Sequence, residues 1–323
     1  MFLEHISGPE DVRKLNREDL PRLAEETRAA LIHRLSDIGG HVGSNLGVVE
    51  LTVALHYVFE SPKDKIVWDV SHQSYAHKIL TGRKEAYLDA SRYGEANGFT
   101  DPRESEHDFF RIGHTATSVS MALGLAKGRD LAGGKENIIA VIGDGALSGG
   151  EAYEGLNYAG EYGRNLIIIL NDNDQSVAEN HGGLYPALRK LRESGGQGEN
   201  VFRGLNLDYR YLEEGNDVLR VTELLEQVRG IDHPIVLHIH TVKGKGLPYA
   251  EKDREEWHSG APFHVADGTP KNGWPQYDTT VHDSLTELLT RDPRSVVLTA
   301  GTPRALGFVG RERGSPSDVL SVR

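Results

Sequence analysis

Two short apolar runs, each followed at once by a polar cluster, constrain this chain more than any other feature of its sequence. The run at residues 138–142 leads into Gly-Asp-Gly at 143–145, and the run at 166–170 leads into Asn-Asp-Asn at 171–173. Short runs rich in β-branched residues are typical of strands buried on both faces of a parallel sheet. Because strand-like and helix-like segments alternate along the chain, we predict a doubly wound α/β fold with a mostly parallel sheet.

Asp144 and Asn173 lie at the carboxyl ends of these two predicted strands. The carboxyl ends of parallel strands meet at one edge of a sheet, where such folds bind ligands, so the two side chains are expected to converge. A carboxylate and an amide oxygen are hard ligands that suit Mg²⁺ or Ca²⁺, and Mg²⁺ often completes its coordination with phosphate oxygens. The pattern therefore favours a metal–diphosphate site, although either residue taken alone is better explained by a turn that its side chain caps.

Charge and composition exclude several classes of function. The 323-residue chain has a net charge of −12 and no basic run, which is unfavourable for binding nucleic acid. It contains no cysteine, which excludes disulfides, thiolate nucleophiles and zinc–sulfur sites and suits a cytoplasmic protein. No apolar stretch is long enough to span a membrane. We therefore expect a cytoplasmic protein that neither binds nucleic acid nor spans a membrane.

Several sequence blocks resemble those of a known protein family, and they occur along the chain in the same order as in that family. They are the two polar clusters described above and the residues at 39–51, 68–73, 77–83 and 113–118. Through these blocks the chain resembles the N-terminal, diphosphate-binding part of the thiamine diphosphate-dependent transketolase and 1-deoxy-D-xylulose-5-phosphate synthase family. The resemblance covers about residues 30–265, continues more weakly to the end, and points to a divergent, transketolase-like branch.

The resemblance implies thiamine diphosphate and Mg²⁺ as cofactors. Asp144, Asn173 and the backbone carbonyl of Gln175 would bind the metal ion, and Gly145 and Ala146 would lie under the diphosphate. Further contacts to the cofactor are implied for residues of the matching blocks and for a lysine that follows a later strand: Ser44, His72, Gly113, His114, Thr115, Asn173 and Lys243. A solvated side chain is an equally good interpretation of Lys243.

Histidines in these blocks are implied to handle protons at the cofactor and the substrate. They are His41, His72, His114 and His258. Histidine suits this work because its charge changes near neutral pH. The alternative for each of them is a hydrogen-bonded structural histidine. His238 and His240 share one face of a predicted strand, where packing explains them better than a metal pair.

The chain is predicted to divide into three parts. Residues 1–250 form the diphosphate-binding domain, 251–276 a linker rich in proline, glycine and charge, and 277–323 the start of a pyrimidine-type domain or a partner-docking tail. Within the first part, residues 179–204 are predicted to be a loop or a short helix. In the family, a pyrimidine-binding domain follows and supplies a glutamate that activates the cofactor. No such glutamate can be assigned before Arg323, so we expect a separate subunit in a hetero-oligomer to supply it, unless this chain is a fragment.

The resemblance implies a transferase that moves a two-carbon ketol or acyl unit to an aldehyde acceptor. Some positions depart from the synthase pattern, in which glycine usually stands at the place of Ser71 and tyrosine at the place of Leu247. These departures favour a ketose donor, as in transketolase. The alternatives are a synthase-type condensation of pyruvate with an aldehyde and, outside the enzymes, a cofactor-binding regulatory subunit without catalysis of its own.

Overall fold

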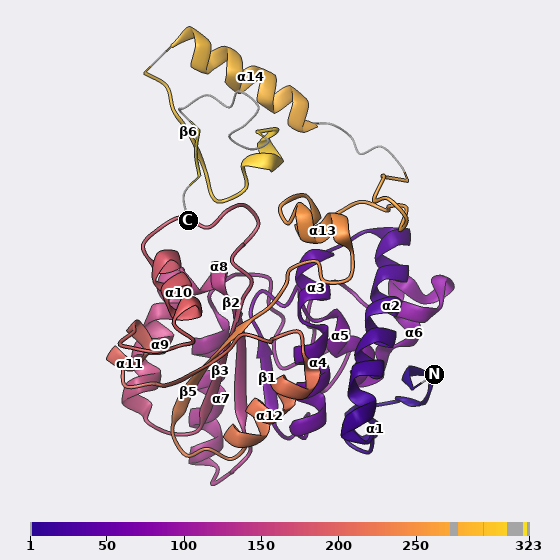
Figure 1. Cartoon of the computed structure of the whole chain (residues 1–323), viewed down its shortest axis with the longest axis vertical. Helices are drawn as coiled ribbons and strands as arrows, with labels where there is room; N and C mark the ends of the chain where they lie inside the picture. Colours follow the sequence, from indigo (N-terminus) through magenta and orange to yellow (C-terminus); the bar gives the residue numbers. More distant parts are fainter. Residues whose placement is uncertain (1, 272–276, 293, 309–318, 322–323) are drawn as a thin grey trace.

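A sheet of five parallel strands forms the centre of the molecule (Figure 1). The structure is a computed structural model that describes residues 2–271, 277–292, 294–308 and 319–321. The strands of this sheet are β1 Lys65–Trp68, β2 Ile138–Gly143, β3 Leu166–Asp172, β4 Asp208–Leu212 and β5 Pro234–His240. Their order across the sheet is β1-β2-β3-β5-β4, which confirms the predicted parallel α/β architecture.

Helices flank this sheet on both faces. Four precede β1: α1 Pro9–Val12, α2 Leu20–Ile38, α3 Gly43–Gly47 and α4 Val49–Val58. The connections within the sheet contain α5 Tyr75–Lys78, α6 Glu85–Leu88, α7 Ser118–Leu131, α8 Asp144–Leu147, α9 Gly150–Tyr162, α10 Leu184–Glu193, α11 Val201–Gly204 and α12 Val218–Val228. After β5 come α13 Pro248–Lys252 and α14 Tyr277–Arg291. Single-turn segments lie at Leu3–His5, Arg17–Asp19, Ile79–Arg83, Ala90–Glu95, Glu256–His258 and Pro303–Leu306. None of the helices in the described ranges combines the length and the apolar character needed to traverse a bilayer.

Alternation along the strands assigns each side chain to one of two cores. Ile139 and Val141 of β2 face the core that also contains side chains from α2, α4 and α12. Ile138 and Ile142 face the opposite core, which contains side chains from α7, α9 and α10. Strands buried on both faces must be apolar at every position, so β2 and β3 form the continuous apolar runs that dominate the sequence.

The strand order follows from the handedness of the connections. From β1 through β2 and β3 to β4 the chain advances across the sheet, and α7, α9 and α10 of these steps lie on one face (Figure 1). The step from β4 back to β5 reverses direction, and its helix α12 lies on the other face. Because crossovers between parallel strands are right-handed, a reversal of direction moves the connecting helix to the opposite face.

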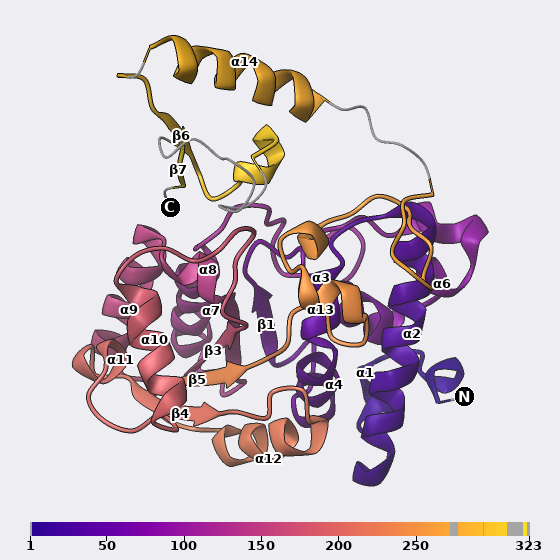
Figure 2. The same ribbon diagram turned by 45° about the horizontal axis from the view of Figure 1, so that its top comes forward.

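The carboxyl ends of β2 and β3 lie next to each other at one edge of the sheet. Gly143 is paired with Asn171, so Asp144 and Asn173 leave the sheet side by side. In Figure 2, where the top of the molecule comes forward, α3, α8 and α13 surround this edge. Such an edge is where parallel α/β folds bind their ligands.

The described chain after residue 277 lies above the carboxyl edge of the sheet (Figure 1). It contains α14 and a parallel pair of short strands, β6 Val297–Thr299 and β7 Val319–Ser321. The backbone N–H of Ala178 donates to the carbonyl of Gly301 at 3.3 Å. Arg304 forms an ion pair with Asp253 at 3.5 Å and a second one with Glu256. This segment therefore contacts two separate loops at the edge.

The division into three parts stays a prediction. Trp257 and Phe263, which belong to the predicted linker, are buried in the core that faces α2 and α4. Residues 272–276 of that linker and residues 309–318 of the predicted last part lie outside the described residues.

Some elements were not predicted from the sequence. The edge strand β4 and the helix α12 are absent from the prediction. The stretch at 179–204, predicted as a loop or a short helix, contains α10, so the helical alternative is confirmed. This helix forms because Tyr185, Leu188 and Leu191 bury one of its faces against the sheet.

A buried chain of hydrogen bonds connects α4 with α5. His56 Nε2 lies 2.9 Å from His77 Nδ1, and His77 Nε2 lies 3.0 Å from Asp108 Oδ1. A carboxylate only accepts hydrogen bonds, so His77 donates through Nε2 and accepts the Nε2–H of His56. Burial lowers the pKa of His77 to about 4 although the contact with Asp108 opposes this shift, and burial holds the pKa of His56 well below its ordinary value. Both rings are therefore neutral in the folded protein at pH 7.

Acid is expected to weaken the fold through His77. The folded-state pKa is about 4 and the ordinary value 6.5, so between these values the unfolded chain binds more protons. The contribution of the neutral, buried His77 to the stability of the fold is complete above pH 6.5 and is lost as the pH falls toward 4. The free energy of unfolding can be measured by urea titration at several pH values in this window. As the pH is lowered, it should fall less steeply in His77→Gln than in the unsubstituted protein, by about 1.4 kcal/mol per pH unit.

The exposed His181 provides the matched control, because His181→Gln changes the same side chain without removing a buried ring. This variant should keep the original slope. Equal slopes in His77→Gln and the unsubstituted protein would contradict the role assigned to His77.

Candidate active site

A cavity of about 240 Å³ opens at the carboxyl edge of the sheet, next to the ends of β1, β2 and β3. Most of the predicted site residues line it: His41, Ser44, His72, Thr115, Asp144, Gly145, Ala146, Asn173, Gln175, Lys243 and His258. These residues come from segments that are far apart in the sequence, and the fold brings them to one place.

Gly113 and His114 are the predicted site residues that do not line this cavity. Both are exposed, and Nδ1 of His114 lies 2.9 Å from the backbone carbonyl of Thr115. Thr115 itself reaches the cavity. Of these three consecutive residues, only Thr115 lines the cavity. The roles of Gly113 and His114 stay predictions.

Asp144 and Asn173 contribute side-chain oxygens to the cavity. Asp144 Oδ1 accepts a hydrogen bond from the N–H of Gly145 at 2.9 Å, and its Oδ2 accepts one from Nδ2 of Asn180 at 2.7 Å. Oδ1 of Asn173 is buried and has no hydrogen-bond donor within the described part of the chain. A buried acceptor of this kind is unfavourable unless a donor or a cation contacts it.

The carboxylates of Asp144 and Asp172 have opposite electrostatic environments. Burial raises the pKa of Asp144, and the negative charge of Asp172 raises it further. Burial also acts to raise the pKa of Asp172, but the contact with His238 at 2.7 Å and the charge of Arg192 hold that pKa below its usual range. The negative charge of Asp172 is therefore stabilised by His238 and Arg192, whereas the surroundings of Asp144 disfavour its ionised form.

The residues present fit a hard divalent cation. The cavity offers the carboxylate of Asp144 and the amide oxygen of Asn173 as donors, with Gln175 close by in the loop after β3. The carboxylate of Asp69 also lines the cavity, but its two oxygens already accept backbone N–H groups. Gln175 forms an isolated antiparallel bridge with Glu179, which constrains its backbone. Over the described ranges, no group of three or more His, Cys, Asp or Glu side chains is arranged to hold a metal ion. A sparse set of oxygen donors suits Mg²⁺ that also binds phosphate oxygens.

His41, His72 and His258 form a cluster beside the cavity. Their ring centroids lie 5.0 Å (His41–His72), 5.6 Å (His41–His258) and 5.4 Å (His72–His258) apart. Burial lowers the pKa of His72 to about 3, with His41 and Lys243 adding to the shift, and burial also lowers the pKa of His41. Both rings are therefore neutral at pH 7, and each can donate one hydrogen bond and accept one.

Several polar atoms around the cavity are buried without a partner among the residues that the structure describes. They are Asn173 Oδ1, Ser44 Oγ and His72 Nδ1. Native proteins rarely leave such atoms unsatisfied. Three of them around one cavity indicate that it is built to bind a polar molecule.

Lys243 places a positive charge at the same cavity. Its side chain is buried, and Nζ donates a hydrogen bond to the backbone carbonyl of Ser176. The alternative of a solvated lysine is therefore wrong. Burial of a cation costs free energy, so a buried lysine next to a cavity is typical of a site for anionic groups.

Asp69 shapes the site and was not identified from the sequence. It follows β1, and its two carboxylate oxygens accept the N–H groups of Ala116 and Ser118, each at 2.9 Å. These hydrogen bonds hold the start of α7 against the cavity. Burial raises the pKa of Asp69, although the hydrogen bonds oppose the shift. The signal that identified Asp144, a polar residue directly after a buried strand, is also present at Asp69.

Comparison with known sequences assigns the chain to a family. A sequence model described as 1-deoxy-D-xylulose-5-phosphate synthase matches residues 3–199. The 1-deoxy-D-xylulose-5-phosphate synthase of Symbiobacterium thermophilum is 40% identical, and the match covers 100% of this chain and 55% of that protein. For 1-deoxy-D-xylulose-5-phosphate synthase 1 of Geobacter sulfurreducens the identity is 39%, with 99% of this chain and 57% of that protein covered. The chain thus spans slightly more than half the length of these relatives.

Transketolases share the fold. The transketolase from Campylobacter jejuni has a TM-score of 0.60 at 19% identity, over 87% of this chain and 44% of that one. The transketolase from Leishmania mexicana has a TM-score of 0.57 at 16% identity, over 84% of this chain and 47% of that one. At such identities the likeness shows the fold alone. The matched family model and the 40% identical relative show that the chain belongs to the 1-deoxy-D-xylulose-5-phosphate synthase family.

Proposed function

We propose that this chain binds thiamine diphosphate together with Mg²⁺ and forms the diphosphate-binding part of a two-carbon transferase. One observation carries the proposal: the buried carboxylate of Asp144 shares a cavity with an oxygen of Asn173 that has no donor among the described residues. A divalent cation would stabilise both groups, and the buried Lys243 adds a positive charge for a phosphate. Membership of the synthase family supports the choice of cofactor.

The diphosphate end of the site is proposed to use the ends of β2 and β3. Asp144, Asn173 and the backbone carbonyl of Gln175 would hold Mg²⁺. Gly145 and Ala146 lie at the start of α8, where their small side chains allow the diphosphate to approach the backbone closely. When bound, the cofactor supplies the nucleophilic carbon and the electron sink for carbon–carbon bond chemistry.

The opposite side of the cavity is proposed to manage protons. The neutral rings of His41 and His72 can each accept a hydrogen bond from a hydroxyl of the substrate or donate one to its carbonyl oxygen, and His258 beside them would take part in moving the proton. Ser44 and Thr115 offer hydroxyl groups that orient the bound molecules. Because burial excludes water from His72, a hydrogen bond to its ring is stronger than it would be at the surface.

Two donors are candidates for the transferred unit. The relatives at 39–40% identity are named synthases, which favours condensation of pyruvate with an aldehyde. The departures at Ser71 and Leu247 favour a ketose donor and transfer of a two-carbon ketol to the aldehyde. A regulatory subunit that binds the cofactor without catalysis is the third candidate, and the donor assay below separates all three.

We also propose that a partner polypeptide completes the site. The relatives are nearly twice as long as the matched region. The family resemblance assigns a glutamate that activates the aminopyrimidine ring to a second domain, and the partner would supply it in a hetero-oligomer. A cytoplasmic location stays a prediction.

Removal of the Asp144 carboxylate tests the metal site. Isothermal titration calorimetry should detect binding of thiamine diphosphate in the presence of Mg²⁺ and no binding after addition of EDTA. Asp144→Ala removes the only carboxylate of the proposed ligand set and should weaken this binding about 100-fold or more. Asn173→Ala should act in the same direction.

Asp232→Ala is the control for these variants, because the Asp232 side chain is 97% exposed. It should bind the cofactor as the unsubstituted chain does. Circular dichroism before each titration checks that the variants are folded. If Asp144→Ala keeps the original affinity, the ligand assignment is wrong.

A donor assay separates the candidate reactions. The chain is combined with a polypeptide that carries a pyrimidine-binding domain, and pyruvate or a ketose phosphate is supplied with an aldehyde. Release of CO₂ from pyruvate is expected for the synthase-type reaction, and consumption of the ketose without CO₂ for ketol transfer. If the cofactor binds but neither donor reacts, the chain is a regulatory subunit and the proposal of catalysis fails.

A further inference from the structure

Ser71, which immediately precedes His72, joins two loops through a single hydroxyl group. Its Oγ donates a hydrogen bond to the backbone carbonyl of Ile112 at 2.9 Å and accepts the N–H of Thr100 at 3.0 Å. The residue is fully buried. One side-chain oxygen thus connects the turn that carries His72 to both ends of the loop at residues 97–112, called here the 97–112 segment.

The backbone at Ser71 is in a conformation that disfavours serine. Its φ is +67°, and that of the preceding Val70 is +56°. Left-handed angles cost free energy for any residue with a Cβ, and glycine avoids this cost. The Ser71 hydroxyl makes two hydrogen bonds that glycine could not make at this position.

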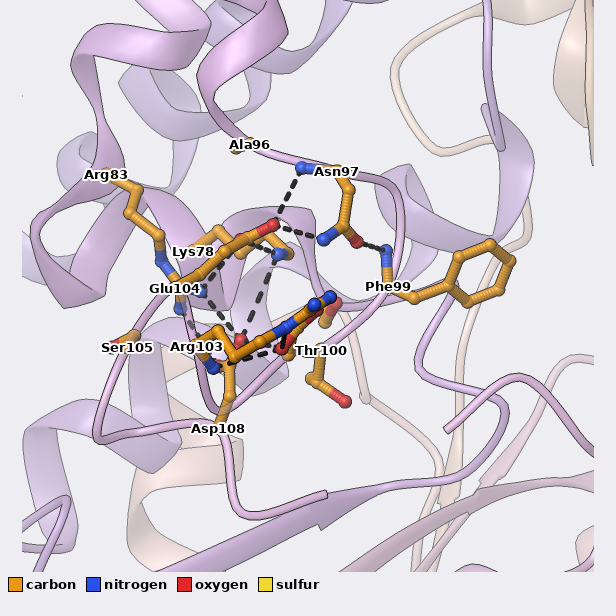
Figure 3. A network of polar contacts seen from close by, with 12 residues as sticks. Lys78, Arg83, Ala96, Asn97, Phe99, Thr100, Arg103, Glu104, Ser105 and Asp108 are labelled. Atoms are coloured by element: carbon orange, nitrogen blue, oxygen red, sulfur yellow. Dashed lines mark hydrogen bonds and ion pairs between the residues drawn. The ribbon is translucent and has the colours of Figure 1, made fainter. Parts of the chain in front are cut away.

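Glu104 anchors the first part of the 97–112 segment from below (Figure 3). One of its carboxylate oxygens accepts the N–H of Asn97 at 3.0 Å. The other lies 3.4 Å from Arg83 and forms an ion pair with Lys78, whose side chain is fully buried. Charge-assisted hydrogen bonds in a buried network are stronger than those at the surface.

Asp108 anchors the second part of the segment in the same network (Figure 3). Arg83 donates to its two oxygens at 2.7 and 3.0 Å, and the N–H of Asp101 donates to it at 2.9 Å. His77 contacts the same carboxylate at 3.0 Å. The segment is therefore held as a unit by groups that do not include Ser71.

The 97–112 segment carries an aromatic side chain to the histidine cluster. The ring of Phe99 packs edge-on against that of His41, with the centroids 5.9 Å apart. The N–H of Phe99 donates to the side-chain oxygen of Asn97 at 2.8 Å, so its place is tied to the anchored part of the segment. The segment thus borders His41, while Ser71 borders His72.

We propose that Ser71 is a positioning residue that sets the 97–112 segment, and with it the Phe99–His41 contact, relative to His72. The hydrogen bonds and ion pairs of Glu104 and Asp108 hold the 97–112 segment together as one unit. The Ser71 hydroxyl then fixes the position of this unit relative to the residues that line the cavity. The proposal rests on the proposed function only in assigning His41 and His72 to the substrate.

Ser71→Gly tests this proposal without endangering the fold, because glycine suits the left-handed backbone and only the hydroxyl is lost. In the uniformly ¹⁵N-labelled protein, hydrogen exchange at the amide of Thr100 should become about tenfold faster or more. The nuclear Overhauser contact between the rings of Phe99 and His41 should weaken. Exchange at Asn97 and Asp101, whose amides bind Glu104 and Asp108, should stay unchanged.

A second variant and a control separate the contributions. Ser71→Ala removes the hydroxyl but keeps the Cβ, so it should show the same faster exchange at Thr100 together with lower stability than Ser71→Gly. Ser91→Gly, at an exposed residue outside the segment, should leave exchange at Thr100 unchanged. In the assembled enzyme, Ser71→Gly should lower kcat about tenfold or more while affinity for thiamine diphosphate is kept.

Two outcomes would overturn the positioning role. In the first, Ser71→Gly shows the same exchange rate at Thr100 and the same Phe99–His41 contact as the unsubstituted chain. The other is faster exchange spread equally over Asn97, Thr100 and Asp101, which would show general loosening. If the unsubstituted chain does not bind thiamine diphosphate at all, the proposed function fails, but the exchange data still decide the role of Ser71.

Discussion

The burial of β2 and β3 on both faces is the constraint on which the rest of the structure depends. Such strands are apolar until their last residues, so polar and charged side chains gather at their carboxyl ends. Asp144 and Asn173 occupy these positions, and the parallel register brings them out side by side. Desolvation of Asp144 is costly, and the same edge supplies the groups that reduce this cost: the N–H of Gly145, the amide of Asn180 and the charge of Lys243. The cavity is therefore a direct consequence of packing the sheet.

Buried strands and their ends could be predicted from the sequence because both follow from local pattern. The strand β4 could not, since it lies at the edge of the sheet and its residues Asp208 and Arg210 interrupt the apolar pattern. The helix α12 carried a readable signal, with apolar residues at helical spacing that bury one face. In the site, contacts that depend on tertiary packing escaped prediction, such as Asn180 on Asp144. The resemblance also could not predict that Gly113 and His114 are exposed and do not line the cavity.

Four histidines at or near the sheet form two pairs that differ in their electrostatic partners. His77 and His238 each contact a buried carboxylate, Asp108 and Asp172, and so belong to the framework. The lowered pKa values of His41 and His72 come first from burial, and no carboxylate contributes to either. A ring without a carboxylate partner is free to exchange its proton with a bound molecule. This contrast gives a physical reason to distinguish the framework histidines from those proposed to act on the substrate, where the sequence offered only their position in motifs.

The unsatisfied oxygen of Asn173 has a consequence for the life of the protein in the cell. A ligand that contacts this oxygen and the carboxylate of Asp144 would offset two unfavourable buried groups at the edge of the sheet. Any molecule that binds only the folded state adds to its stability by mass action. Small differences in stability change how much of a protein escapes degradation. The occupancy of this cavity is therefore expected to change the amount of folded polypeptide as well as its ability to act.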